Sequence, residues 1–159
     1  MNILIDEHKK LLIELIAAKI DFILVGGYAV IFHGYTRTTG DMDIWLKPTN
    51  QNRDFLVPVL EKIGILPEDI DLLRSVDFTK TIAFHVDDYP KRVDFLTGMS
   101  GLVFEEAYQN RSLLPLGEYS VPILRLDDLL VNKLMSGRLK DMSDVEELQK
   151  IMKLKKDKF

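Results

Sequence analysis

The chain has 159 residues, of which 47% are hydrophobic and 29% are charged, and its formal net charge is −4. This composition is that of an ordinary globular protein, and it excludes the overall positive field that indicates nucleic-acid binding. The absence of cysteine excludes disulfides and thiolate zinc sites and fits a cytoplasmic location. No apolar run approaches the roughly 20 residues of a membrane helix. From the length we expect one domain over residues 1–159.

The first third of the chain predicts a helix, a strand and a second short helix. Apolar residues recur at helical spacing over residues 5–20, and the continuous apolar run 22–25 is typical of a buried strand. Gly26 and Gly27 interrupt this strand, tolerate positive φ and allow another molecule to approach the backbone. A short helix is expected from Tyr28 to Gly34. Its N-terminus, behind a glycine turn, is a natural place for phosphate.

Two acids mark the next predicted strand. Asp41 and Asp43 stand at i and i+2, so both side chains point to the same face, while Met42 and Ile44 share the other face. Two such charges about 5 Å apart repel by roughly 3 kcal/mol at an effective dielectric constant near 20. A divalent cation such as Mg²⁺, which prefers carboxylate oxygens, would offset this repulsion. The alternative is an exposed strand end with two solvated aspartates.

This region carries a family resemblance. The residues that carry the resemblance are Asp41 and Asp43 together with two short segments, Gly26-Gly27-Tyr28-Ala29-Val30 and Arg37-Thr38-Thr39. The pattern resembles that of the polymerase-β-type nucleotidyltransferase superfamily and is most similar to the AbiEii-type toxins and the small lincosamide-type enzymes. The resemblance implies an α/β (α+β) fold with a mixed sheet flanked by helices and with C-terminal helices. It also implies transfer of a nucleoside monophosphate from an NTP to an acceptor hydroxyl, with two Mg²⁺ or Mn²⁺ ions.

The loop before Asp41 supplies candidate phosphate contacts. Arg37 could pair with a triphosphate oxygen, and the Thr38 and Thr39 hydroxyls could donate to phosphate. The alternative is a solvated loop. The resemblance adds the backbone of Gly26 and Gly27 to this nucleotide-binding set.

Two further residues near the motif have simpler interpretations. We expect His33 to pack against or cap its helix rather than act as a general base. Trp45 alternates onto the face of Asp43, so it either walls the pocket or belongs to the core.

A helix is predicted over residues 51–63, with its apolar residues inward and a kink or late start at Pro58. Another helical segment is expected over 67–73.

Residues 81–86 and 92–96 predict two strands of an antiparallel hairpin. Asp94 lies among apolar residues in the second of them, where an unpaired carboxylate is costly to bury. The resemblance implies that Asp94 is the third acid, that the three acids hold the metals, and that Asp94 activates the acceptor hydroxyl. The alternative is a salt bridge from Asp94 to Arg92 or Lys91. We expect His85 on the sheet surface rather than in the site.

The remaining chain predicts mainly helices. A helix is expected over 102–109, then a turn-rich stretch, and then an edge strand over 119–124 because of Pro122. Asp127 is a plausible N-cap of a helix that ends at Gly137, and a last helix starts near residue 142. The helical C-terminal part thus begins at about residue 127.

Lys133 emerges from the apolar stripe of the helix before Gly137. It could simply reach the surface along its aliphatic stem, whereas the resemblance implies contact with nucleotide phosphates. Asp141 and Asp144 follow it. They could position Lys133 or Lys140, or be solvated.

The sequence leaves the acceptor open among tRNA, a protein and a small molecule. An antitoxin partner and a homodimer are open as well. A different class of function is a non-catalytic nucleotide- or partner-binding module that keeps the fold. No Gly-x-x-x-x-Gly-Lys-Ser/Thr loop and no Gly-x-Gly-x-x-Gly fingerprint occurs in the chain, which argues against two other phosphate-binding folds.

Overall fold

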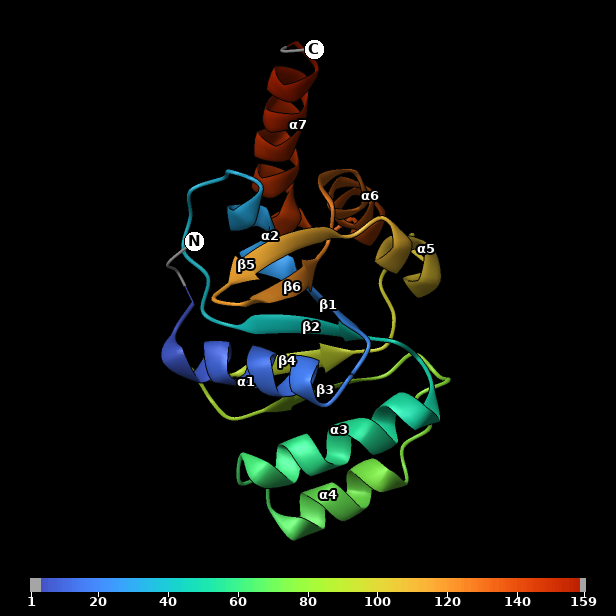
Figure 1. The fold of residues 1–159 in the computed structure, drawn as a ribbon. Helices are drawn as coiled ribbons and strands as arrows, with labels where there is room; N and C mark the ends of the chain where they lie inside the picture. Colours follow the sequence, from blue (N-terminus) through green and yellow to red (C-terminus); the bar gives the residue numbers. More distant parts are fainter. Residues whose placement is uncertain (1–3, 158–159) are drawn as a thin grey trace.

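The computed structural model describes residues 4–157 and shows a mixed six-stranded sheet with helices packed around it (Figure 1). The strands lie in the order β3-β4-β2-β1-β6-β5. Their bounds are β1 Phe22–Val25, β2 Met42–Leu46, β3 Ala83–Val86, β4 Val93–Leu96, β5 Ser112–Leu116 and β6 Tyr119–Ile123. The pairs β1–β2, β3–β4 and β5–β6 are antiparallel, whereas β2–β4 and β1–β6 are parallel.

The helices fill the intervals between strands. Their bounds are α1 Asp6–Ala17, α2 Gly26–Phe32, α3 Asn50–Lys62, α4 Pro67–Arg74, α5 Phe104–Gln109, α6 Leu126–Ser136 and α7 Met142–Asp157, with a 3₁₀ turn, η1, at Leu139–Asp141. In Figure 1, α3 and α4 lie side by side at one end of the molecule, and α7 projects from the other end. No helix within residues 4–157 is long and apolar enough to span a membrane.

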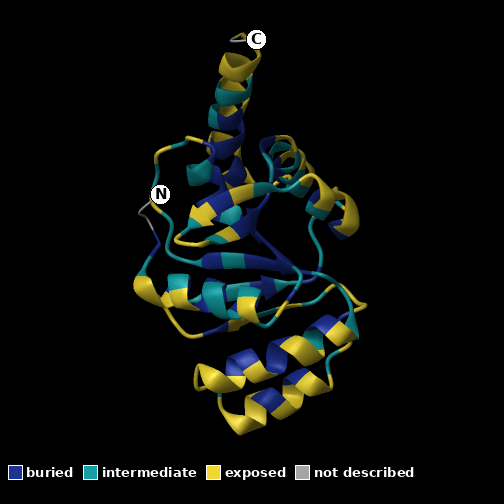
Figure 2. Ribbon diagram, viewed as in Figure 1, coloured by how far each residue is buried: buried dark blue, intermediate teal, exposed yellow. Residues whose placement is uncertain are grey.

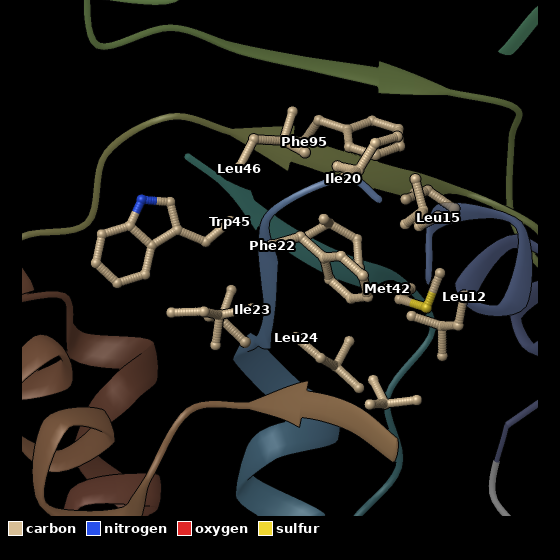
Figure 3. Close-up of a cluster of buried hydrophobic side chains, with 14 of the residues drawn as sticks. Leu12, Leu15, Ile20, Phe22, Ile23, Leu24, Met42, Trp45, Leu46 and Phe95 are labelled. Atoms are coloured by element: carbon tan, nitrogen blue, oxygen red, sulfur yellow. The ribbon is translucent and has the colours of Figure 1, made fainter. Parts of the chain in front are cut away.

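The two faces of the sheet differ in chemistry. On one face, Leu24, Ile44 and Phe95 are register partners on adjacent strands and are fully buried. Leu12 and Leu15 of α1 belong to the same cluster, which Figure 3 draws. Burial of each such side chain contributes about 1.5–3 kcal/mol. The helices α3 and α4 also have two different sides: Figure 2 shows that their inward sides are buried and their outward sides are exposed. The opposite face carries the acids.

The expected fold class is confirmed, since the sheet is mixed and flanked by helices. The predicted hairpin pairs β3 with β4, and the helix at Pro67 starts with that proline in its first turn. Gly137 ends α6 with φ 64°, the left-handed value that favours glycine.

The expectation of turns around residues 112–117 is wrong. Residues Ser112–Leu116 form β5, which pairs with β6 through a turn at Gly117 and is itself the edge strand. β6 is therefore interior, despite Pro122. The parallel pairing of β6 with β1 is limited to the C-terminal end of β6, where Leu24 is the register partner of Ile123. The ladder between these two strands therefore does not need an N–H donor at Pro122.

Three details of the helices also differ from expectation. Phe55 and Ile63 are 46% and 39% exposed rather than inward, because the buried stripe of α3 runs through Asn52, Leu56, Val59 and Leu60. Pro58 lies within α3, on its exposed side. Residue 125 occupies the N-cap position of α6, so Asp127 lies in the first turn, where its charge suits the helix dipole.

Candidate active site

A cavity of about 990 Å³ opens on the sheet face that carries the acids, bounded on the far side by α6, η1 and the start of α7. The residues that the sequence predicted for the site all contribute to its lining. They are Gly26, Gly27, Arg37, Thr38, Thr39, Asp41, Asp43, Asp94 and Lys133. The fold thus gathers stretches that are up to about a hundred residues apart in the sequence.

The acids form a row across two strands. Asp43 of β2 and Asp94 of β4 are register partners, so their side chains project side by side from one face. Asp41 shares this face, two residues before Asp43. Burial and, after it, the charges of Asp94 and Asp41 together raise the pKa of Asp43 from 3.8 to about 6, against an opposing effect of Lys133. The surrounding cations therefore do not cancel the combined cost of burying this carboxylate and placing it beside two others.

Arg92 is the cation closest to this row. Its Nη2 lies 2.9 Å from Oδ1 of Asp94, and its Nε lies 3.2 Å from Oδ2 of the same carboxylate. Nε is also 3.9 Å from Oδ2 of Asp41. The salt bridge that the sequence offered as the alternative for Asp94 is thus present, and its partner is Arg92 rather than Lys91. Because Arg92 and Asp94 stand at i and i+2, strand periodicity alone would have placed Arg92 in the site.

The acid row offers two carboxylates, rather than three, to a metal ion. Across the described residues 4–157, no three His, Asp or Glu side chains converge on one point as metal ligands do. Both oxygens of Asp94 instead accept hydrogen bonds from Arg92. The donor chemistry nevertheless fits a hard divalent cation at Asp41 and Asp43. Both offer carboxylate oxygens, and the raised pKa of Asp43 marks repulsion that a cation would relieve.

Side chains of this chain pack directly against the backbone of Gly26 and Gly27, where a Cβ atom would otherwise lie. Gly26 has φ +68°, and a Cβ there would collide with the carboxylate of Asp43. A Cβ at Gly27 would collide with the hydroxyl of Thr39 and approach Nη2 of Arg37 to 3.3 Å. The helix α2 begins at Gly26 itself, two residues earlier than expected. The glycine pair is therefore required for close packing between α2, β2 and the loop before β2.

The loop 37–41 is tied to α7 by Arg37 and has an internal hydrogen bond from Thr39. Arg37 lies against Asp144 of α7, with Nε 3.1 Å from Oδ1 and Nη2 3.2 Å from Oδ2. The Thr39 hydroxyl donates to the carbonyl oxygen of Asp41 over 3.3 Å. The solvated-loop alternative is therefore wrong for Arg37, whose side chain is only 29% exposed.

Lys133 lies in a buried ionic network rather than at the surface. Its Nζ is 3.0 Å from Oδ1 of Asp141 and 3.1 Å from Oδ2 of Asp144. Arg138 and the Ser136 hydroxyl contact the other oxygen of Asp141 at 2.9 and 2.8 Å. Burial alone would raise the pKa of Asp141, but the hydrogen bonds from Lys133 and Ser136 outweigh it and lower the pKa.

The network resolves two alternatives left open by the sequence. Asp141 and Asp144 are both 4% exposed, so they are not solvated, and both hold Lys133 rather than Lys140. With Arg37 and Arg138, the network contains three cations and two anions. The network therefore carries a formal charge of +1, and Lys140, which lines the same wall of the cavity, opposite the acid row, adds a further positive charge. The sequence offered the positioning of Lys133 by Asp141 and Asp144 as one alternative, but it gave no sign of the salt bridge between Arg37 and Asp144.

Three other residues have structural roles. Nε2 of His33 is 2.7 Å from the carbonyl oxygen of Leu124, which confirms the packing interpretation. Trp45 is 1% exposed and stacks edge-on against Phe104, so it belongs to the core and not to the cavity wall. His85 is exposed on β3, as expected for the sheet surface.

Comparison with solved structures supports the fold. The crystal structure of lincosamide antibiotic adenylyltransferase LnuA, lincomycin-bound, is similar over 95% of this chain and 99% of that chain, with 18% identity and a TM-score of 0.58. An antigenic nucleotidyltransferase-like protein from Paracoccidioides brasiliensis is similar over 92% of this chain and 73% of that chain, with 16% identity and a TM-score of 0.54. Comparison with curated protein sequences gave no match. A family model described as "nucleotidyltransferase of unknown function (DUF6036)" matches residues 3–158, and the chain therefore belongs to this nucleotidyltransferase family.

Proposed function

We propose that this protein transfers a nucleoside monophosphate from an NTP to an acceptor hydroxyl and releases pyrophosphate, with Mg²⁺ or Mn²⁺ in the site. The observation that carries the proposal is the row of Asp41, Asp43 and Asp94 facing a cationic wall across one cavity, in a chain of a nucleotidyltransferase family. Such an arrangement suits a substrate that brings both phosphate charge and a metal ion.

In this proposal Asp41 and Asp43 would hold one metal ion, and Asp94 would help to hold a second. When bound, such ions neutralise phosphate charge and stabilise in-line displacement at phosphorus. Asp94 accepts the proton of the acceptor hydroxyl. The acceptor oxygen forms its bond to the α-phosphorus while the bond from that phosphorus to the pyrophosphate oxygen breaks. The pyrophosphate leaves with the electron pair of the broken bond.

Arg92 sets a condition for this chemistry. While its guanidinium occupies both oxygens of Asp94, that carboxylate is unavailable as a base or a ligand. The side chain of Arg92 is 38% exposed, so it can leave Asp94 without opening the core. A bound triphosphate offers it another set of anionic oxygens.

The opposite wall would hold the triphosphate. Lys133 is 7% exposed and already contacts two carboxylates, so it acts mainly as a fixed positive charge. Arg37 and Arg138 have more exposed guanidinium groups and can reach phosphate directly, and the Thr38 and Thr39 hydroxyls can add hydrogen bonds. Gly26 and Gly27 line the same cavity beside Asp43 and Thr39, and their backbone would complete the proposed nucleotide site.

We propose a small molecule as the acceptor. A cavity of about 990 Å³ lies at the upper end of the range for one drug-sized ligand, so it has room for a nucleotide and a small acceptor together. A net charge of −4 gives no general attraction to tRNA. The neighbour named as a lincosamide adenylyltransferase is consistent with this choice. A tRNA or protein acceptor, with an antitoxin partner, is the competing version, and either reaction would draw on the cytoplasmic NTP pool.

A second candidate is a non-catalytic nucleotide-binding module. Two observations favour it: Arg92 occupies Asp94, and Lys133 is fully paired within the protein. In that case the fold would bind an NTP without transferring the nucleotide.

The test is label transfer from each α-³²P-labelled NTP with Mg²⁺, offered to lincomycin, to aminoglycosides, to bulk tRNA and to the protein itself. Asp43→Asn should abolish any transfer. The matched control is Asp54→Asn on α3, whose side chain is 62% exposed and lies outside the cavity. Transfer by wild type and control but not by Asp43→Asn supports the proposal. Mg²⁺-dependent NTP binding without transfer to any acceptor would favour the binding module.

A further inference from the structure

The strand β3 presents unpaired main-chain groups at one edge of the sheet. It is the terminal strand in the sheet order, and within residues 4–157 it pairs only with β4. The N–H of Thr97 donates to the carbonyl of Ile82, so this register pair is hydrogen-bonded. Because bonded and non-bonded pairs alternate in an antiparallel ladder, the N–H and C=O groups of Ala83 and His85 point away from β4. Both residues are exposed.

An apolar groove runs beside this edge. A second cavity, of about 610 Å³, lies between β3 and α4. Its floor consists of apolar side chains from α3, α4 and β3, among them Leu60, Ile70, Leu73 and Phe84. At its rim Leu72 is 66% exposed. The groove is on the sheet face of Phe84 and Phe95, whereas Asp43 and Asp94 are on the other face. It is therefore separate from the candidate active site.

The charge around the groove is of one sign. Its lining includes Asp69 of α4 and Asp87 and Asp88 at the end of β3, and it includes no Lys or Arg. All three aspartates are exposed. An occupant with apolar side chains and a positive charge at its ends would complement both the floor and the rim.

We propose that β3 and the adjoining groove bind an extended segment of a protein partner, which carries apolar residues at alternate positions and Lys or Arg at its ends. The segment adds a strand to the sheet by bonding to the main chain of Ala83 and His85. Its apolar side chains enter the groove, and its basic residues lie near Asp69, Asp87 and Asp88. The proposal is independent of the nucleotidyl-transfer reaction.

The first test uses the full-length protein and a fluorescent peptide about seven residues long, in which leucine alternates with threonine between a lysine at each end. We expect saturable binding by fluorescence polarisation and slower amide hydrogen exchange at Ala83 and His85 by NMR. The same peptide with glutamate in place of both lysines should bind at least about tenfold more weakly. The lysine-flanked peptide should lose binding when it is N-methylated on the edge facing β3, because it then cannot donate to the carbonyls of Ala83 and His85.

Surface variants locate the binding site. Leu72→Lys should weaken binding by about tenfold, since it removes apolar contact and adds a like charge, and Asp69→Lys should weaken it a few-fold. Leu113→Lys is the matched control, because Leu113 is 52% exposed on the opposite edge strand β5. The melting temperatures of all three should stay near that of the wild type. Absence of saturable binding, equal loss with Leu113→Lys, or unchanged exchange at Ala83 and His85 would overturn the proposal.

Discussion

Replacement of Asp43 by asparagine should make the metal-free protein more stable at neutral pH. Asparagine keeps the size of the side chain and removes its charge. In the wild type, burial and the neighbouring charges of Asp94 and Asp41 raise the pKa of Asp43 from 3.8 to about 6. Ionising Asp43 therefore costs more free energy in the folded protein than in the unfolded chain.

The size and sign of the effect follow from this difference in pKa. At pH 7.5 Asp43 is ionised in both states, and the wild type carries a penalty of up to about 3 kcal/mol. Below pH 3.8 it is protonated in both states, and the penalty vanishes. The wild type thus loses this stability as the pH rises from 3.8 through about 6, whereas Asp43→Asn does not. The variant should melt up to roughly 5–10 °C higher at pH 7.5.

The assay is thermal and urea denaturation of both proteins in EDTA between pH 4 and 8, followed by far-UV circular dichroism. Addition of Mg²⁺ should then raise the melting temperature of the wild type and leave that of Asp43→Asn nearly unchanged, because the proposed ligand is missing. Asp54→Asn serves as the control in both series.

Two results would refute the reasoning. If Asp43→Asn is no more stable than the wild type at pH 7.5, the repulsion at Asp43 is already cancelled in the folded protein. If the difference between the two proteins is the same at pH 4 and pH 8, it does not arise from the charge of Asp43.

Further predictions concern packing and the ionic network. Asp144→Asn should destabilise the protein by about 3 kcal/mol in urea denaturation, because Lys133 then loses half of its buried partners. Gly27→Ala should cost about 1–3 kcal/mol, since its Cβ would lie 2.8 Å from the Cβ of Thr39, and the double variant with Thr39→Gly should recover most of that loss. Trp45→Phe should cost about 1–3 kcal/mol, because the smaller ring loses buried contacts and leaves a cavity, whereas the buried Nε1 has no hydrogen-bond partner among residues 4–157 to lose.

Local sequence patterns were sufficient for the centre of the fold. The run 22–25 is buried on both sides, and such a run is visible as continuous apolar sequence. The hairpin of β3 and β4 follows from two short strands around a turn. β5 escaped prediction because Pro115 and Gly117 are typical of turns, and only its pairing with β6 makes the segment a strand.

The candidate site was predictable where periodicity decides which face a residue occupies. Asp41 and Asp43 share a face by strand spacing, and the register of β2 with β4 then brings Asp94 alongside Asp43. A salt bridge from Asp94 to Arg92 or Lys91 was the alternative that the sequence offered, and the same spacing favours Arg92. The sequence left open whether Asp141 and Asp144 position Lys133 or Lys140 or are solvated, and it could not decide, because Asp141 lies in a 3₁₀ turn and Asp144 in the following helix. Their convergence depends on how η1 and α7 pack against α6.

Through the ionic network, the C-terminal elements α6, η1 and α7 contribute side chains to the candidate site. Asp144 of α7 contacts both Arg37, in the loop before β2, and Lys133 of α6. Buried salt bridges contribute little net stability compared with apolar packing, since desolvation offsets their attraction. The more consistent role for this network is therefore positional: it fixes Arg37 and Lys133 on the wall opposite the acid row. The cationic wall is assembled only when α6, η1 and α7 are docked, so the site depends on residues from both ends of the chain.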